Sequence, residues 1–346
     1  MVCVCIVFSH IENIIMSRIY SLDLAKTVAI FLVIFTHLKE NMGFYGLPDY
    51  AREISYYIDR MGVPLFFMVS GVLMLGSKKE FSSKTTKRVI LIIIGVSVTS
   101  IITNFIYYNL FSNLNSILVS IEYNNAITTK NIDKAYQLWY MFYYLPLFIL
   151  AIPLSAFTAT ASQYQLAKLC TALFIMGPLS QVIQNKVIDN DFIYILTKTD
   201  LFSYLLYMTL GLYIFRMEKK HSLYLSIAIL VATTLISSFA SYNLQPFFKF
   251  DVWYSRDIAL FISSSCLFYM LCKIKAGRFN KFVTIVSLNS YAAYLLHVAI
   301  IYFFVYIAGS ALKELPYKII FSLIIIITSI IVSYLLNKTP LKLILQ

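Results

Sequence analysis

Ten stretches of mostly apolar residues run along the chain, and they constrain its fold more than any other feature. A helix needs about 20 apolar residues to cross the hydrocarbon core of a bilayer. The chain has 346 residues, of which 60% are hydrophobic and 13% charged, whereas a soluble domain carries about 25% charged residues. The sequence therefore predicts an all-α, polytopic membrane helix bundle of about ten transmembrane helices, near residues 20–38, 61–76, 89–111, 138–157, 166–183, 201–215, 222–241, 258–272, 284–309 and 319–336.

Basic residues separate onto alternate connections between these stretches. We count the charged residues on each side of the membrane by letting all ten stretches cross it and by leaving Lys26 and Asp23 within the first stretch. One side then carries 16 basic and three acidic residues, and the other carries 11 basic and 12 acidic ones. Because basic loops stay in the cytoplasm, both termini are predicted to be cytoplasmic. The net charge of +12 does not indicate a partner nucleic acid, since the basic loops are short and separated rather than gathered in one footprint.

The remaining sequence indicates one membrane domain. The five cysteines are not spaced as metal ligands or as a disulfide framework, so no metal site is expected. Residues 1–15 lack the basic start of a signal peptide and are too short to span. We interpret them as a dispensable leader, with Met16 as a candidate initiator and residues 16–346 as the domain. The longest hydrophilic connection, near 112–137, is Asn-rich and is expected outside the cell.

Lys26 and His37 lie on one face of the first apolar stretch. Eleven residues at about 100° each make three turns plus about 20°, and Asp23 falls within about 60° of Lys26. An ionisable side chain at the centre of a spanning helix costs roughly 2.5–3.5 kcal/mol and usually has a function. Two interpretations stay open on spacing alone. One is a buried Asp23–Lys26 ion pair with His37 at the interface, and the other is two ends, about 16 Å apart, of one polar passage.

Five segments, in order along the chain, resemble the acyltransferase-3 family of membrane O-acyltransferases. The first holds Lys26 and His37, whose spacing is similar to the family's Arg/Lys-x10-His motif. The others resemble its second-helix signature, the basic start of its third helix, its Leu-Trp-Phe motif and a late segment ending in Leu-His: RMGVPLFFMVSG (60–71), FSSKTTKRVILI (81–92), LWY (138–140) and SYAAYLLH (290–297). The resemblance is to the surface-polysaccharide O-acetyltransferases in particular.

This resemblance implies an enzyme that transfers an acyl group, expected to be acetyl, from cytosolic acetyl-CoA to a hydroxyl of a cell-surface or lipid-linked polysaccharide. It implies a multi-pass protein of the bacterial inner membrane that uses acyl-CoA as a substrate and holds no bound cofactor. His37 is the expected base for the weakly nucleophilic hydroxyl. Lys26 is expected to hold the donor or to neutralise charge on the thioester oxygen, and Asp23 to orient Lys26.

Donor binding is expected at Lys84, Lys87 and Arg88, whose charges suit the phosphates of CoA. Members of the family often carry Arg-x-x-Arg where this chain has Lys84-x-x-Lys87, and lysine lacks the bidentate fork of arginine. The charge that is usual in cytoplasmic loops explains any single one of these lysines equally well.

Four further residues are candidates with competing structural explanations. Arg60 and Trp139 are expected on the acceptor side, although tryptophan at that depth is also typical of an interfacial belt. Ser70 is a candidate covalent nucleophile, but a Ser-Gly pair in mid-helix favours a close helix contact. His297 is the second candidate histidine, with packing or an interhelical hydrogen bond as the alternative.

An exporter of polysaccharide or lipid-linked glycan is the main alternative function, and a non-catalytic scaffold is the third. Transporters often carry broken helices at matching positions in two halves, and no such pairing is visible in the sequence. Only the enzyme would consume acyl-CoA.

Overall fold

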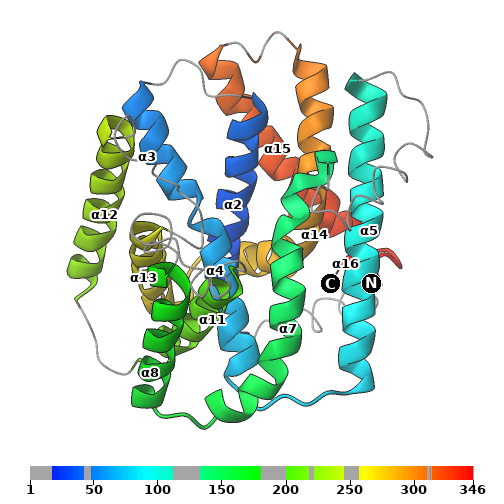
Figure 1. The fold of residues 1–346 in the computed structure, drawn as a ribbon. Coiled ribbons are helices and arrows are strands. Elements are labelled where there is room, and N and C mark those ends of the chain that lie inside the picture. Colours follow the sequence, from blue (N-terminus) through cyan, green and yellow to red (C-terminus); the bar gives the residue numbers. More distant parts are fainter. Residues whose placement is uncertain are drawn as a thin grey trace.

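The computed structural model is helical throughout the residues it describes, which are 18–42, 48–111, 133–180, 200–217, 222–244, 257–309, 312 and 314–345 (Figure 1). No strand occurs within these ranges, so the all-α prediction is confirmed. The helices are α2 (Tyr20–Met42), α3 (Asp49–Asp59), α4 (Gly62–Leu75), α5 (Ser83–Phe111), η2 (Asp133–Leu138), α7 (Trp139–Thr158), α8 (Gln163–Phe174), η3 (Ile175–Leu179), α11 (Leu201–Phe215), α12 (Leu223–Leu244), α13 (Ile258–Lys273), α14 (Asn280–Ala308), α15 (Leu315–Leu336) and α16 (Lys342–Leu345).

The described part of each predicted apolar stretch is almost entirely helical, and the stretch near 166–183 continues from α8 into η3. Among the described residues, 7 helical segments are long and apolar enough to cross a membrane, and α11 and α13 are shorter apolar helices. The chain is therefore a multi-pass membrane protein. A total of about ten crossings and the cytoplasmic position of both ends stay predictions. The predicted leader and Met16 lie outside the described residues.

Helix α3 is absent from the predicted set because its sequence, DYAREISYYID, is too polar for an apolar search. It continues into α4 across a bend at Arg60 and Met61. Pro64 lies in the first turn of α4, where the missing N–H is tolerated. The second crossing segment therefore runs from Asp49 to Leu75, and it begins earlier than residue 61.

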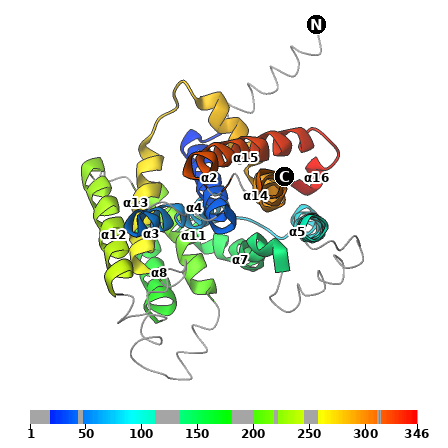
Figure 2. The ribbon, with the colours of Figure 1, turned by 90° about the horizontal axis from the view of Figure 1, so that it is seen from above.

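Helices α2 and α4 form the centre of the bundle (Figures 1 and 2). α2 packs against α14 and α4, while α4 packs against α11 and α7. α12 and α15 lie at the edges of the bundle and leave most of their surface exposed. Their exposed hydrophobic side chains are largely Ile, Leu and Tyr, which suits contact with lipid and its interface. The polar residues of α2 are thus enclosed by neighbouring helices.

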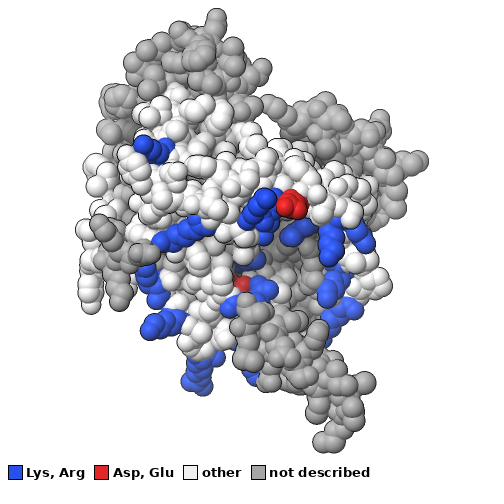
Figure 3. All heavy atoms as spheres, turned by 90° about the horizontal axis from the view of Figure 1, so that it is seen from below, with Lys and Arg blue, Asp and Glu red and all other residues white. Residues whose placement is uncertain are grey.

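Basic side chains gather on the face where α4 connects to α5 and α7 connects to α8. Both connections lie at the lower end of the bundle in Figure 1, and Figure 3 shows many Lys and Arg side chains on this face and few acidic ones. The charge asymmetry read from the sequence is therefore a feature of the folded molecule. A basic face of this kind is typical of the cytoplasmic side of a membrane protein.

Helices α4 and α11 cross at two glycines. A Cβ atom added to Gly71 would lie 1.9 Å from the carbonyl oxygen of Met208, and one added to Gly211 would lie 2.3 Å from the carbonyl oxygen of Met68. Small residues let helix backbones approach closely in a membrane, where packing replaces the hydrophobic effect as the driving force for association. The crossing therefore depends on the absence of side chains at both positions.

We expect Gly71→Ala to destabilise the bundle by about 2 kcal/mol or more, because the added methyl group would overlap the backbone of Met208. Gly277→Ala is the matched control, since nothing lies within 4 Å of its Cβ position. The measurement is the midpoint of thermal unfolding in detergent. Equal midpoints for the two variants would show that the α4–α11 crossing tolerates a side chain.

Candidate active site

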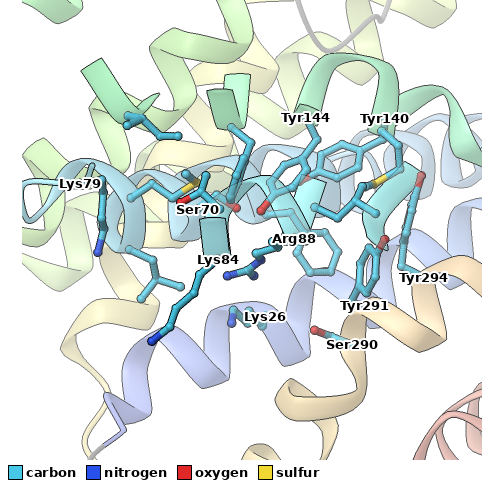
Figure 4. A pocket seen from close by; sticks show the side chains of 18 of the residues that line it. Lys26, Ser70, Lys79, Lys84, Arg88, Tyr140, Tyr144, Ser290, Tyr291 and Tyr294 are labelled. Atoms are coloured by element: carbon cyan, nitrogen blue, oxygen red, sulfur yellow. The ribbon is translucent and has the colours of Figure 1, made fainter. Parts of the chain in front are cut away.

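A cavity of about 450 Å³ lies between α2, α4, α5, α7 and α14 (Figure 4). We call it the inner cavity. Lys79 and Glu80, in the exposed connection between α4 and α5, line its mouth on the basic face. Tyr140, near the start of α7, and Tyr294, midway along α14, line it deeper in the bundle. The inner cavity thus leads from the basic face into the interior.

Three cations from two helices face the inner cavity. Lys26 of α2 is half-buried and points toward Arg88 of α5, and Lys84 lies one helical turn before Arg88 (Figure 4). Residues four apart share a helix face, so Lys84 and Arg88 line the cavity together. The Arg88 guanidinium lies 5.6 Å from the ring centroid of Phe148. This concentration of positive charge favours an anionic ligand.

Lys87 does not line the inner cavity. It lines an adjoining hollow of about 300 Å³ together with Lys84 and Arg88, and with Leu343 and Ile344 of α16, so the three predicted donor-binding residues meet in that hollow. The sequence pattern Lys84-x-x-Lys87 suggested one pair, but the cavity pairs Lys84 with Arg88 instead. The reason is helical rotation, which turns Lys87 to a different face of α5.

Ser70 lies on the wall of the inner cavity, as do Tyr140 and Tyr144 of α7. The close helix contact that the sequence suggested for Ser70-Gly71 is made by Gly71. Tyr291 and Tyr294 of α14 complete this hydroxyl-rich side of the cavity. The cavity therefore joins a cationic side to a tyrosine-lined side.

Asp23 pairs with Arg18 and not with Lys26. The Arg18 guanidinium contacts both carboxylate oxygens, with Nη2–Oδ1 at 2.5 Å and Nε–Oδ2 at 2.7 Å. Ser287 of α14 donates a hydrogen bond to Asp23 Oδ1 at 2.6 Å. Among the described residues, no carboxylate lies at ion-pair distance from Lys26. Asp23 thus ties the start of α2 to α14, and Lys26 remains available to the cavity.

Further along α2, His37 is the centre of a second polar group, which we call the outer cluster: His37, Glu40, Arg60, Tyr136 and His297. Nδ1 of His37 lies 2.7 Å from Oε2 of Glu40, and Arg60 Nη2 donates to Oε1 of Glu40 at 3.0 Å. A carboxylate only accepts hydrogen bonds, so this contact places the His37 proton on Nδ1 and leaves Nε2 as an acceptor. Glu40 thereby fixes the orientation of the His37 ring.

Two further contacts support the outer cluster. Asn41 donates to the backbone carbonyl of His37 at 2.7 Å and to the Tyr136 hydroxyl at 2.6 Å. Lys39 and Asp59 form a buried ion pair beside Arg60. The bend between α3 and α4 therefore brings Asp59 and Arg60 against the outer half of α2.

A row of aromatic rings links the outer cluster to the inner cavity. The ring centroids of His37 and His297 are 5.1 Å apart, those of His297 and Tyr294 are 6.0 Å apart, and those of Tyr294 and Tyr140 are 5.5 Å apart. Tyr294 and Tyr140 line the inner cavity, whereas the two histidines do not. One ring therefore separates the cavity from His297, which the sequence left between packing and a site.

Trp139 belongs to neither group. Its ring packs against Tyr140, Tyr143 and Tyr204, with centroids 6.4, 6.0 and 6.1 Å away. It thus joins an aromatic cluster between α7 and α11. Arg60, the other residue predicted for the acceptor side, does lie beside His37 through Glu40.

Sequence reasoning missed Glu40 and the cavity tyrosines. Glu40 follows His37 by three residues, a spacing that puts two side chains on one helix face, so the signal was present but unused. Tyr140, Tyr144 and Tyr291 carried no signal of their own, because aromatic residues near span ends are common in membrane proteins.

Comparisons with known proteins identify the family of the chain. Residues 19–338, nearly the whole chain, match the family model Acyl_transf_3, described as an acyltransferase domain. No curated protein and no solved structure matches the chain. The matched range holds both Lys26 and His37, the basic start of α5, and α14 with His297. The resemblance seen in the sequence is confirmed, and the chain belongs to the acyltransferase-3 family of membrane acyltransferases.

Proposed function

We propose that this protein transfers an acetyl group from acetyl-CoA to a hydroxyl of a cell-surface or lipid-linked polysaccharide. The observation that carries the proposal is the cationic inner cavity, which leads from the basic face to Tyr294. Beyond Tyr294, the ring of His297 lies between the cavity and the His37–Glu40 pair. We further propose that the protein resides in the bacterial inner membrane, with the basic face in the cytoplasm.

The inner cavity suits an acyl-CoA donor. Its volume of about 450 Å³ falls in the usual range for small-molecule sites, which is about 300–1,000 Å³. Lys84 and Arg88 lie where the phosphates of a cytosolic donor would enter, and charge-assisted hydrogen bonds to phosphate are strong. Lys26 lies opposite them and contributes a third positive charge. Asp23 acts on Lys26 indirectly, by fixing the start of α2 against α14.

The proposed reaction needs one base and one route for the proton. Nε2 of His37 removes the proton of the acceptor hydroxyl, and the oxygen attacks the thioester carbonyl carbon. The C–S bond then breaks, and the proton passes from His37 to the sulfur, which leaves as the CoA thiol. Glu40 and Arg60 hold the imidazole in the tautomer that this requires.

Replacing His37 by alanine is expected to lower acyl transfer by roughly 10²- to 10⁴-fold, since the base is lost. Membrane insertion and the unfolding midpoint should stay unchanged. The assay follows consumption of labelled acetyl-CoA and appearance of labelled ester with purified protein. Lys281→Ala, on the exposed start of α14, is the control. Wild-type rates in His37→Ala would rule out the assigned base, and wild-type protein that never consumes acetyl-CoA would favour an exporter.

Replacing Glu40 by glutamine keeps the shape of the side chain but removes its negative charge from His37 and Arg60. A hydrogen bond to a charged group contributes about 1.5–3 kcal/mol, so kcat should fall roughly 10- to 100-fold while the KM for acetyl-CoA changes little. Steady-state kinetics at varied donor concentration provide the measurement. A raised donor KM with unchanged kcat would contradict an orienting role.

The double variant Lys84→Ala/Arg88→Ala should raise the KM for acetyl-CoA at least about tenfold, because two charge-assisted contacts are lost. Lys275→Ala/Arg278→Ala removes the same charge from the exposed connection between α13 and α14 and serves as the matched control. Donor titrations of both proteins at one salt concentration decide the question. Equal KM values for the two double variants would show that Lys84 and Arg88 act only as general surface charge.

A further inference from the structure

Two histidines in the outer cluster offer acceptors side by side. We propose that the acceptor sugar presents a vicinal diol, with the reacting hydroxyl at His37 and its neighbour at His297. This inference rests on the proposed acyl transfer and adds a requirement that the transfer itself does not make, namely a second hydroxyl that stays unacylated.

Both imidazoles have their Nδ1 atom occupied. In His37 it lies 2.7 Å from the Glu40 carboxylate, and in His297 it lies 2.7 Å from the backbone carbonyl of Tyr294 and 3.2 Å from that of Ala293. Carboxylate and carbonyl oxygens only accept hydrogen bonds, so Nδ1 carries the proton in each ring. In both neutral imidazoles, Nε2 is therefore an acceptor.

Neither Nε2 atom has a hydrogen-bond donor among the residues that the structure describes. His297 is fully buried, at 0% exposure, and its Nε2 has no hydrogen-bond partner among the described residues. The described contacts of His37 likewise involve Nδ1 and the ring face but not Nε2. The ring centroids are 5.1 Å apart at an interplanar angle of 33°. Two acceptors cannot satisfy each other, so each needs a donor from elsewhere.

Three hydrogen-bond donors beside the two rings are engaged with other acceptors. Asn41 donates to the Tyr136 hydroxyl, and the Tyr294 hydroxyl donates to the backbone carbonyl of Gln137. Gln137 in turn donates from Nε2 to the carbonyl of Leu295 at 3.4 Å. These bonds hold η2 against α2 and α14 at the level of His297, and none of them reaches Nε2 of either histidine. We infer that a bound molecule supplies the donor.

A vicinal diol supplies two O–H donors on adjacent carbons, which matches two acceptors on neighbouring rings. One hydroxyl gives its proton to Nε2 of His37 while its oxygen bonds to the thioester carbonyl carbon. The C–S bond breaks, and the proton goes on to the departing sulfur. The second hydroxyl keeps its proton and donates it to Nε2 of His297. A lone hydroxyl would leave this buried acceptor unpaired, which is unfavourable.

The test uses full-length protein in detergent with labelled acetyl-CoA and two small alcohols. Ethylene glycol is a vicinal diol, whereas 2-methoxyethanol has one reactive hydroxyl and an ether oxygen that cannot donate. We expect ester to form about tenfold faster from ethylene glycol, after correction for its two hydroxyls, because one buried hydrogen bond distinguishes the alcohols. A ratio near one overturns the inference, as does the absence of ester from both alcohols while acetyl-CoA consumption still depends on His37.

Two variants separate this role from packing. His297→Phe keeps a ring but has no acceptor, so the ratio between the alcohols should fall to about one. His297→Gln places an amide oxygen near the position of Nε2 and should retain part of the preference. An unchanged ratio in His297→Phe overturns the inference. If wild-type protein consumes no acetyl-CoA, the proposed function itself fails, which is a different result from a lost preference.

Discussion

Charged side chains inside an apolar bundle need partners, and the arrangement of α2 depends on how those partners are supplied. Asp23 is neutralised by Arg18 near the start of α2, and Glu40 by Arg60 near its end. An unpaired charge as buried as Asp23 would be costly, whereas Glu40 is partly exposed, with 35% of its side chain accessible. The Arg60–Glu40 pair ties α2 to the bend between α3 and α4, and Ser287 ties Asp23 to α14. Lys26 has no carboxylate partner among the described residues and faces a cavity instead. It is the charge in α2 left for a ligand.

The inner cavity and the outer cluster are separate sites because α2 places Lys26 and His37 far apart along its axis. Lys26 and His37 are separated by about 16 Å along α2. Lys26 therefore lines the inner cavity near the basic face, and His37 belongs to the outer cluster farther along the helix. Tyr294 lies between them, because it lines the cavity and contacts His297. The inner cavity is lined at one end by Lys26 and does not reach His37, because the ring of His297 lies between Tyr294 and His37. A continuous polar passage from Lys26 to His37 stays a prediction.

Much of the fold was predictable because crossing a membrane demands long apolar helices with few exceptions. Polar α3 was not, since its burial depends on the bend after Asp59 and on packing against α12. Within the site, His37 was predictable from its spacing to Lys26. Glu40 was overlooked because charge near a span end is ordinary, and only its 2.7 Å contact with His37 gives it a role.

The sequence by itself determined the class of fold, the basic face and the family, because hydropathy, charge asymmetry and motif order are properties of the chain. It also determined that Lys26 and His37 share a helix face. Only the tertiary structure decided that Ser287 bonds to Asp23, that Lys26 shares a cavity with Arg88, and that His297 lies against His37. Those relations join residues on different helices or different faces, and their distances depend on how helices pack, which no local pattern encodes.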